Sequence, residues 1–295
     1  GTLSKVIVKP HKTPFFQDED KWAILICGGY NVNSNEYRFW NDCNCAYNML
    51  IQNYIPKNHI IVLMSDGNDP GLDRKISNGN NDSSPTDFDG DQISDVNYSA
   101  TYDNISSVFD SLSTIISTDD ELLVFCVDHG SYDSGHSYFY LWGMRMSDTQ
   151  FASQINKISN DATIDILLCQ CASGGFIDDL SAPNRVIGTS CNYNENGYAY
   201  LDPQNGACTH SEYPYYWINA LRARNDHGTK IIADPNNDLS VSFSEAHNYA
   251  INNLSHSDIQ HPQYYSSPSN LGDIRGIHWY YAIPSISGTA LCSNV

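Results

Sequence analysis

The chain has 295 residues, enough for one large domain or two modest ones and for a substantial buried core. It carries 34 acidic and 15 basic residues, a formal net charge of −19, which argues against nucleic-acid binding through phosphate neutralisation. No stretch approaches the roughly 20 consecutive apolar residues that cross a bilayer, so no membrane span is expected.

Strands and helices alternate along the first part of the chain. An apolar strand is expected over 22–27, followed by a Gly-Gly loop. Asn41-Asp42 can cap a helix that runs to about residue 54. A second strand is expected over 59–64. Residues 68–100 are rich in Asn, Asp, Ser, Pro and Gly, which predicts one long, irregular, acidic excursion.

The alternation continues to the last helix. We expect helices over 102–116, 147–158, 213–224 and 242–254, a hairpin-like segment over 138–142, and strands beginning at 121, 163 and 185. A loop-rich tail follows over 255–295. This pattern predicts an α/β fold with a mostly parallel central sheet covered by helices on both faces. Because the sequence contains no internal repeat and no convincing linker, residues 1–295 are expected to form a single domain.

Two of the apolar strands end on a reactive side chain. The run from Glu121 ends at His129-Gly130, and the run from Thr163 ends at Cys171. Ligands collect beyond the carboxyl ends of strands in open α/β sheets, so these residues are candidates for a thiol–imidazole pair. The Gly130 and Cys171 amides are the candidate donors to the oxyanion of an acyl-transfer intermediate. Taken singly, each side chain is more simply a satisfied histidine or a structural thiol.

The residues around this pair resemble a known family. Val127-Asp128-His129-Gly130 and Cys169-Gln170-Cys171-Ala172-Ser173-Gly174 are similar to the D-H-G and E-A-C-E-S-G motifs of legumain-type cysteine peptidases, the hemoglobinase or asparaginyl endopeptidase branch of the caspase-like fold. Weaker similarity extends the match over residues 21 to about 220, through the segments at 21–29, 36–42, 56–62 and 189–192. The resemblance implies a three-layer α/β sandwich and a bacterial member of the family.

The resemblance also implies roles for single residues. His129 is the general acid/base, and Cys171 is the nucleophile that forms a thioester acyl-enzyme, without a cofactor. Cys171 is favoured over Cys169 because the Ser-Gly of the motif follows it at the family spacing. The family's asparagine that orients the histidine aligns with Glu36, one position from Asn35, so one of these two is expected to orient His129.

Three residues are candidates for substrate binding. Legumain-type enzymes cut after Asn by means of an Arg and an Asp; Arg38 matches the Arg by its Tyr-Arg context, and Glu212 is the match to the Asp. Ser190 is expected to line the same pocket. A donor and an acceptor together can bind a neutral amide. Without Arg38 in the pocket, Glu212 would favour Lys or Arg instead.

The acidic excursion contains a candidate calcium loop. Asp87, Asp89, Asp91 and Asp95 occupy positions 1, 3, 5 and 9, as in the first half of an EF-hand loop. The glycine of the loop is displaced, and the bidentate Glu at position 12 is absent. We expect a structural Ca²⁺ that orders the excursion and takes no part in chemistry; the alternative is a solvated acidic loop.

The cysteines bear on the cellular compartment. The nine cysteines lack a CxxC…CxxC spacing, so structural zinc is not expected. Five of them lie in helix-start or loop contexts and could pair: Cys43, Cys45, Cys191, Cys208 and Cys292. Together with high Asn, Ser and Tyr content, this predicts an extracytoplasmic protein, secreted, periplasmic or on the cell surface. The chain starts at Gly1 without a secretory signal, as a mature form would.

The leading hypothesis is therefore a cysteine endopeptidase with a protein or peptide substrate, and with a propeptide or inhibitor as a further expected partner. Two alternatives stay open. One is a transpeptidase of the same family, in which an amine replaces water. The other is a catalytically silent binding protein that keeps the fold.

Overall fold

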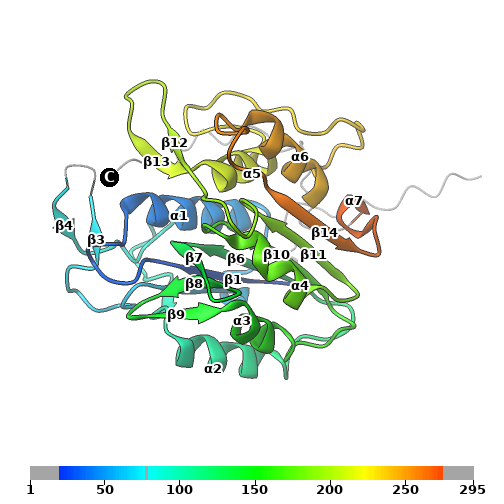
Figure 1. The fold of residues 1–295 in the computed structure, drawn as a ribbon, viewed down its shortest axis with the longest axis horizontal. Coiled ribbons are helices and arrows are strands. Elements are labelled where there is room, and N and C mark those ends of the chain that lie inside the picture. Colours follow the sequence, from blue (N-terminus) through cyan, green and yellow to red (C-terminus); the bar gives the residue numbers. More distant parts are fainter. Residues whose placement is uncertain (1–19, 77–78, 275–295) are drawn as a thin grey trace, which may run out of the picture.

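A seven-stranded sheet forms the centre of the molecule in the computed structural model, which describes residues 20–76 and 79–274 (Figure 1). The strand order is β14-β11-β10-β6-β1-β2-β5, and all neighbours are parallel except β14 and β11. The strands are β1 (Lys21–Cys27), β2 (Ile60–Met64), β5 (Val96–Tyr98), β6 (Glu121–Val127), β10 (Thr163–Leu168), β11 (Arg185–Thr189) and β14 (Gln263–Ser267).

Helices cover both faces of this sheet, which confirms the predicted α/β sandwich. One face carries α1 (Tyr37–Gln52), α5 (Glu212–Arg222) and α6 (Phe243–Asn253); the other carries α2 (Tyr102–Leu112), α3 (Asp148–Ile155) and α4 (Ile177–Leu180). Two 3₁₀ turns, η1 (Lys57–His59) and η2 (Ser173–Phe176), and the short α7 (Leu271–Ile274) complete the helical elements of the described residues.

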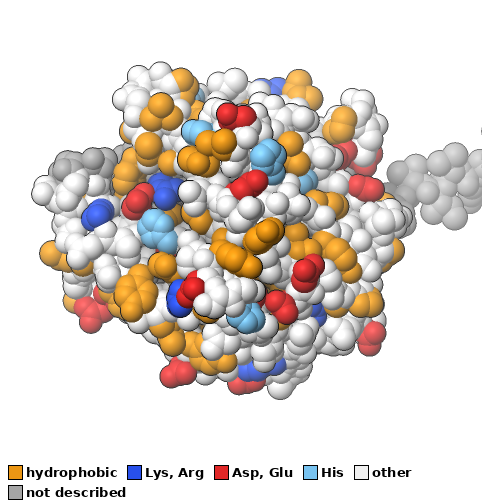
Figure 2. All heavy atoms as spheres, in the orientation of Figure 1, with side chains coloured by type: hydrophobic (Ala, Val, Ile, Leu, Met, Phe, Trp, Pro, Cys, Tyr) orange, Lys and Arg blue, Asp and Glu red, His pale blue; other side chains and the backbone are white. Residues whose placement is uncertain are grey.

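Smaller sheets lie around the central one. They are the three-stranded β7 (Gly130–Asp133), β8 (His136–Leu141) and β9 (Met144–Ser147), and the pairs β12 (Ala199–Leu201) with β13 (Cys208–Ser211) and β3 (Arg74–Lys75) with β4 (Asn81–Asp82). The face shown in Figure 2 carries scattered acidic, histidine and hydrophobic side chains, and its few Lys and Arg side chains are isolated.

Two separate cores explain why the central strands are apolar throughout. Alternate residues of a strand point to opposite faces, and here both faces are covered. Ala23 and Leu25 of β1 lie in the core beneath α1, α5 and α6, whereas Ile24 and Ile26 lie in the core above α2 and α3. The continuous apolar run that the sequence shows is the direct consequence.

The helix that was predicted to begin at Asn41-Asp42 begins four residues earlier in the structure. α1 starts at Tyr37, and Asn41 and Asp42 lie inside it as buried residues instead of capping it. The Asp42 carboxylate accepts hydrogen bonds from the backbone amide of Ser211, 2.9 and 3.2 Å away. Asn41 and Asp42 resemble a helix start in the sequence, but Asp42 binds Ser211, which is distant along the chain.

Three other segments are more regular than expected. The excursion at 68–100 contributes β3, β4 and the edge strand β5, and the hairpin-like segment at 138–142 is part of the three-stranded β7–β9 sheet. The tail is not loop-rich throughout, because β14 adds an antiparallel edge to the central sheet. The remainder of the predicted tail, 275–295, lies outside the described residues.

Of the five cysteines that were expected to be able to pair, three are free thiols in the structure. Cys43 and Cys191 are buried free thiols, and Cys208 is an exposed free thiol. Cys45 is disulfide-bonded, and Cys292 lies outside the described residues. Within the described part of the chain, no helix combines the length and apolar character needed to cross a membrane.

Candidate active site

The register of two neighbouring strands brings His129 and Cys171 together. β6 and β10 are parallel, with Cys126 opposite Leu168, and the Cys169 amide continues the ladder with a 2.9 Å hydrogen bond to the Cys126 carbonyl. His129 lies three residues beyond Cys126, and Cys171 lies three residues beyond Leu168. Both residues therefore lie just beyond the carboxyl ends of these strands, where α/β folds bind ligands.

Gly130 allows the two strand ends to touch. A Cβ atom at this position would lie 2.2 Å from the Cys171 carbonyl oxygen and 2.9 Å from that of Tyr138. The Tyr140 amide donates a hydrogen bond to the His129 carbonyl. Hydrogen-bonded and non-hydrogen-bonded pairs alternate along an antiparallel ladder, so the next pair, Gly130 opposite Phe139, is a non-hydrogen-bonded one. The Gly130 amide thus points away from β8 and is available to a ligand.

A backbone carbonyl, not a side chain, holds the His129 ring. Nε2 lies 2.9 Å from the carbonyl oxygen of Ser34, which only accepts, so Nε2 carries the proton and Nδ1 of the neutral ring is left as the basic nitrogen. The edge of the ring packs on Phe39, with ring centroids 5.0 Å apart. Burial, followed by the positive charge of Arg38, lowers the pKa of His129. The imidazole is therefore kept neutral and able to accept a proton.

Asn35 and Glu36, the two residues expected to orient His129, form their hydrogen bonds to other groups. The buried Asn35 amide donates instead to Ser65 Oγ and to the Asp73 carbonyl, each 2.8 Å away, and so fixes the loop that presents Ser34. Glu36 binds Arg38, with 2.6 Å between Oε2 and Nε, and acts on His129 only through its charge, which opposes that of Arg38.

Asp128 is a further residue of the candidate site, and the sequence alone indicates no role for it. It is buried, and its two oxygens accept the backbone amides of Gly29 and His129, each at 2.5 Å. Burial raises the pKa of this carboxyl, whereas the two amides oppose that shift. Asp128 thus ties the loop after β1 to the backbone of His129. A carboxylate directly after a buried strand was the available signal.

The turn after β10 presents the Cys171 thiol. Ala172 adopts a left-handed conformation, with φ of 58°, and its amide donates to the Glu195 carbonyl 2.8 Å away. The Gly197 amide lies 3.4 Å from the Cys171 sulfur. Cys171 is partly exposed, whereas Cys169 is 4% exposed within the core. The Ala172 amide is already bonded, which leaves those of Gly130 and Cys171 as candidate oxyanion donors.

The predicted substrate-binding residues do not gather in one place. Arg38 Nη1 lies 3.3 Å from Ser211 Oγ, at the start of α5. The buried Glu212 carboxylate turns away: it accepts hydrogen bonds from Ser255 and lies 2.9 Å from His256 Nδ1. No hydrogen bond or ion pair joins Arg38 to Glu212 among the described residues.

Ser190 also has a different position from the predicted one. It is 1% exposed, and its hydroxyl donates to the Gln170 carbonyl, 2.9 Å away, beneath the Cys171 turn. Ser190 thus supports that turn from below.

Three of the four acidic loop residues lie close together. Oxygens of Asp87, Asp89 and Asp95 lie within 4.8 Å of one another. Asp91 instead forms an ion pair with Lys57 at 2.5 Å, and Lys57 also contacts Asp89. The ammonium of Lys57 supplies part of the positive charge that a cation would provide, so Ca²⁺ stays a prediction.

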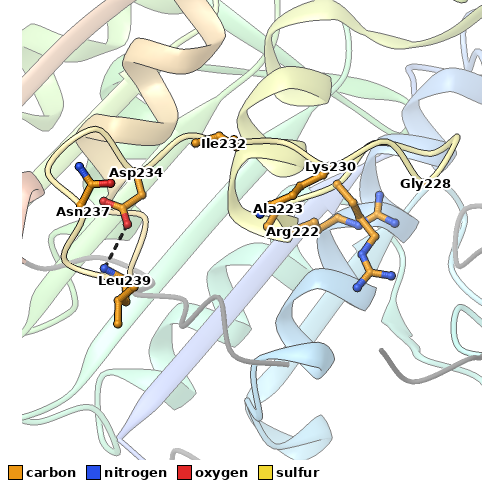
Figure 3. A pocket seen from close by; sticks show the side chains of 9 residues that line it. Arg222, Ala223, Gly228, Lys230, Ile232, Asp234, Asn237 and Leu239 are labelled. Atoms are coloured by element: carbon orange, nitrogen blue, oxygen red, sulfur yellow. Dashed lines mark hydrogen bonds between the residues drawn. The ribbon is translucent and has the colours of Figure 1, made fainter. Parts of the chain in front are cut away.

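Two pockets lie outside this group of residues. One, of about 420 Å³, adjoins the Cys171 turn. The other, of about 530 Å³, lies beyond the end of α5, with Arg222 and Lys230 on one side and Asp234, Asn237 and Leu239 on the other (Figure 3). None of the candidate catalytic, substrate-binding or calcium-binding residues lines this larger pocket.

The architecture and the strand-end His and Cys define a caspase-like α/β protein. Residues 21–263 match the model of the Peptidase C13 family, and the chain belongs to that family. Its members are cysteine peptidases, some of which act as transamidases, with protein or peptide substrates.

No curated protein matches the chain. Among solved structures, the chain is similar to the crystal structure of protein GSU0716 from Geobacter sulfurreducens, with a TM-score of 0.53 and 8% identity over 84% of this chain and 93% of that one. At this identity the likeness concerns the fold alone.

Substitution of Gly130 by alanine tests the contact between the strand ends. The added methyl group must displace the Cys171 or Tyr138 carbonyl, so we expect kcat/KM to fall by about 100-fold, because a displacement of about 1 Å costs that much. Gly143→Ala is the control: nothing lies within 4 Å of its Cβ position, and its φ of 75° costs stability only, about 1 kcal/mol. Equal activity of the two variants would contradict the packing argument.

Calcium binding is testable through thermal unfolding. We expect millimolar Ca²⁺ to raise the Tm, Asp89→Asn to abolish that rise, and Lys57→Met to tighten binding by removing the competing ammonium. Mg²⁺ at the same concentration is the control for ionic strength. A Tm that is the same with Ca²⁺, with Mg²⁺ and with a chelator would reject the site.

Proposed function

We propose that this protein is a cysteine endopeptidase that uses Cys171 as nucleophile and His129 as general acid/base. One observation carries the proposal: β6 and β10 are neighbouring parallel strands, and His129 and Cys171 follow closely after their carboxyl ends. Their backbones are in contact at Gly130, which fixes this arrangement. A silent binding protein would have no need of the partly exposed thiol beside a neutral imidazole.

The geometry supports a definite sequence of steps. His129 Nδ1 takes the proton of the Cys171 thiol, and the sulfur attacks the substrate carbonyl to form a tetrahedral intermediate. The Gly130 and Cys171 amides donate to its oxyanion. The carbon–nitrogen bond breaks, and His129 returns the proton to the leaving amine. Water then adds to the thioester, giving up a proton to His129, and the acid is released as the thiol re-forms.

The surroundings of Arg38 favour a neutral side chain, Asn, before the scissile bond. Lys or Arg at this position would need a free carboxylate in the pocket, but Glu212 is engaged by Ser255 and His256. Asp42 lies buried behind Ser211, and burial raises its pKa to about 8, so this carboxyl is held largely protonated at neutral pH. The Arg38 guanidinium can donate to an amide oxygen.

An extracytoplasmic location is part of the same proposal. The disulfide at Cys45 supports it, because disulfides persist in oxidising compartments.

Replacement of Cys171 by alanine is expected to lower kcat/KM by about 10⁴-fold or more on a fluorogenic peptide that ends in Asn, since the nucleophile is removed. Cys169→Ala, two residues earlier in the segment that follows β10, is the matched control: it empties a small buried volume and should leave kcat within about twofold while it lowers stability by about 1 kcal/mol. Added hydroxylamine separates hydrolysis from transfer by capturing the thioester. Full activity of the Cys171→Ala variant would reject the proposal.

Thiol labelling needs one further control. Cys208 is an exposed free thiol and will react with any alkylating agent, so labelling is done in a Cys208→Ser background. Loss of activity should then follow the modification of Cys171 alone.

Arg38→Gln is expected to have two effects. It should lower kcat/KM for Asn substrates, and it should move the acid limb of the pH profile to higher pH. The second effect follows because Arg38 lowers the pKa of His129, so removing this positive charge raises that pKa and the neutral base is lost at a higher pH. Lys75→Gln is the control, because Lys75 lowers the same pKa more weakly. An acid limb unmoved by Arg38→Gln would exclude this coupling.

A further inference from the structure

The proposed reaction steps do not use the pocket of about 420 Å³ beside the Cys171 turn. Its floor is formed by Gly174 and Gly175 of η2, and its walls include Tyr132 of β7 and Tyr193. The two tyrosine rings meet edge to face with centroids 5.2 Å apart, and each residue is nearly half exposed, at 47% and 45%. The pocket is thus open to solvent and lined on one side by aromatic rings.

Gly175 keeps this pocket open. A Cβ atom there would lie 2.1 Å from Ser137 Oγ of β8 and 3.2 Å from the Tyr193 Cβ. Only a residue without a side chain lets the nucleophile's turn pack this closely against the β7–β8 hairpin. The same feature that positions the turn therefore leaves space between the two tyrosines and η2.

The position of the pocket relative to Cys171 indicates which part of a substrate reaches it. Arg38 belongs to α1 and Ser211 precedes α5, whereas the pocket is lined by Asp148 of α3 and by Ile177 and Asp178 of α4. The first two helices cover one face of the sheet and the last two cover the other (Figure 1). An extended peptide with its Asn at Arg38 crosses Cys171 and continues to the pocket on the leaving-group side. Tyr132 lies two residues beyond Gly130 along β7, a distance of about 7 Å, which two residues of an extended substrate also span.

The polar lining of the pocket is acidic. Asp148 lines it with a buried carboxylate, which accepts the Ser137 amide and lies 2.8 Å from His136 Nδ1. Asp178 lines it from the first turn of α4, next to the exposed Asp179. Burial, followed by the charge of Asp148, raises the pKa of Asp179, and His136 opposes this shift.

The basic groups nearby do not cancel this charge. Arg145 pairs with Asp133 at 3.3 Å and lies over the Tyr138 ring, 3.9 Å from its centroid. His136 is bound to Asp148 alone. A cation entering the pocket would meet carboxylates as well as aromatic faces, and both attract a positive charge.

We propose that this pocket binds a Lys or Arg side chain at the second residue after the scissile bond. The proposal rests on the proposed peptidase function and adds to it a preference on the leaving-group side. Asp178 and Asp179 supply the charge, and Tyr132 and Tyr193 supply the aromatic contact.

Matched peptides test this preference. In quenched fluorescent peptides that differ only in the second residue after Asn, we expect Lys to exceed Glu in kcat/KM by about fivefold, the effect of a solvent-accessible charge pair. The double variant D178N/D179N should reduce that ratio to near one. Asp161→Asn is the control, since this exposed carboxylate precedes β10 at the opposite edge of the sheet. A ratio near one in the wild type, or a ratio unchanged by D178N/D179N, would overturn the proposal.

Two further measurements separate this proposal from the peptidase function. A coumarin amide of the same peptide has no residue beyond the cut, so D178N/D179N should leave its hydrolysis unchanged. Binding of the Lys and Glu peptides to the Cys171→Ala variant, measured by fluorescence anisotropy, decides the pocket without catalysis. Equal affinities for the two peptides would reject the cation site, even if the wild-type protein cleaves peptides. Tighter binding of the Lys peptide, together with no cleavage by the wild-type protein, would uphold the site and reject the peptidase function.

Discussion

The pairing of β6 with β10 is the constraint on which the site depends. A parallel ladder fixes each strand residue against one neighbour, so a register that sets Cys126 against Leu168 also brings the segments that follow the two strands, with His129-Gly130 and Cys171, next to each other. Slippage by one residue would turn the side chains to opposite faces. The two cores prevent this, because each face of both strands is packed against helices and neither face tolerates the other's residues.

Backbone contacts further fix the positions of His129 and Cys171. The lack of a side chain at Gly130 lets the two strand ends meet, and the buried Asp128 carboxylate ties His129 to the loop after β1. That loop leads to Ser34, whose carbonyl orients the imidazole. The orientation of the base is therefore set by main-chain atoms, which are held by buried polar side chains such as Asn35.

The electrostatics of the site are asymmetric in a chain of net charge −19. Arg38 brings a positive charge to the side of α1, where it lowers the pKa of His129 and faces the proposed Asn pocket. Asp148 and Asp178 line the pocket on the side of α3 and α4. The proposed substrate path would therefore bring a peptide near opposite charges before and after the bond to be cut.

Local sequence was enough to predict the parallel strands of the central sheet other than β5, most helices and the candidate reactive pair. Periodicity, caps and glycine-bounded apolar runs act over a few residues, and the D-H-G and C-A-S-G segments mark the two strand ends. The partners of Asn41, Asp42, Glu212 and Ser190 were decided only by tertiary structure, as was the strand β14. Each of these depends on a contact with a residue far along the chain. The Ser34 carbonyl that binds His129 could not be predicted either, because every residue has a backbone carbonyl and the side chain does not show which one is used.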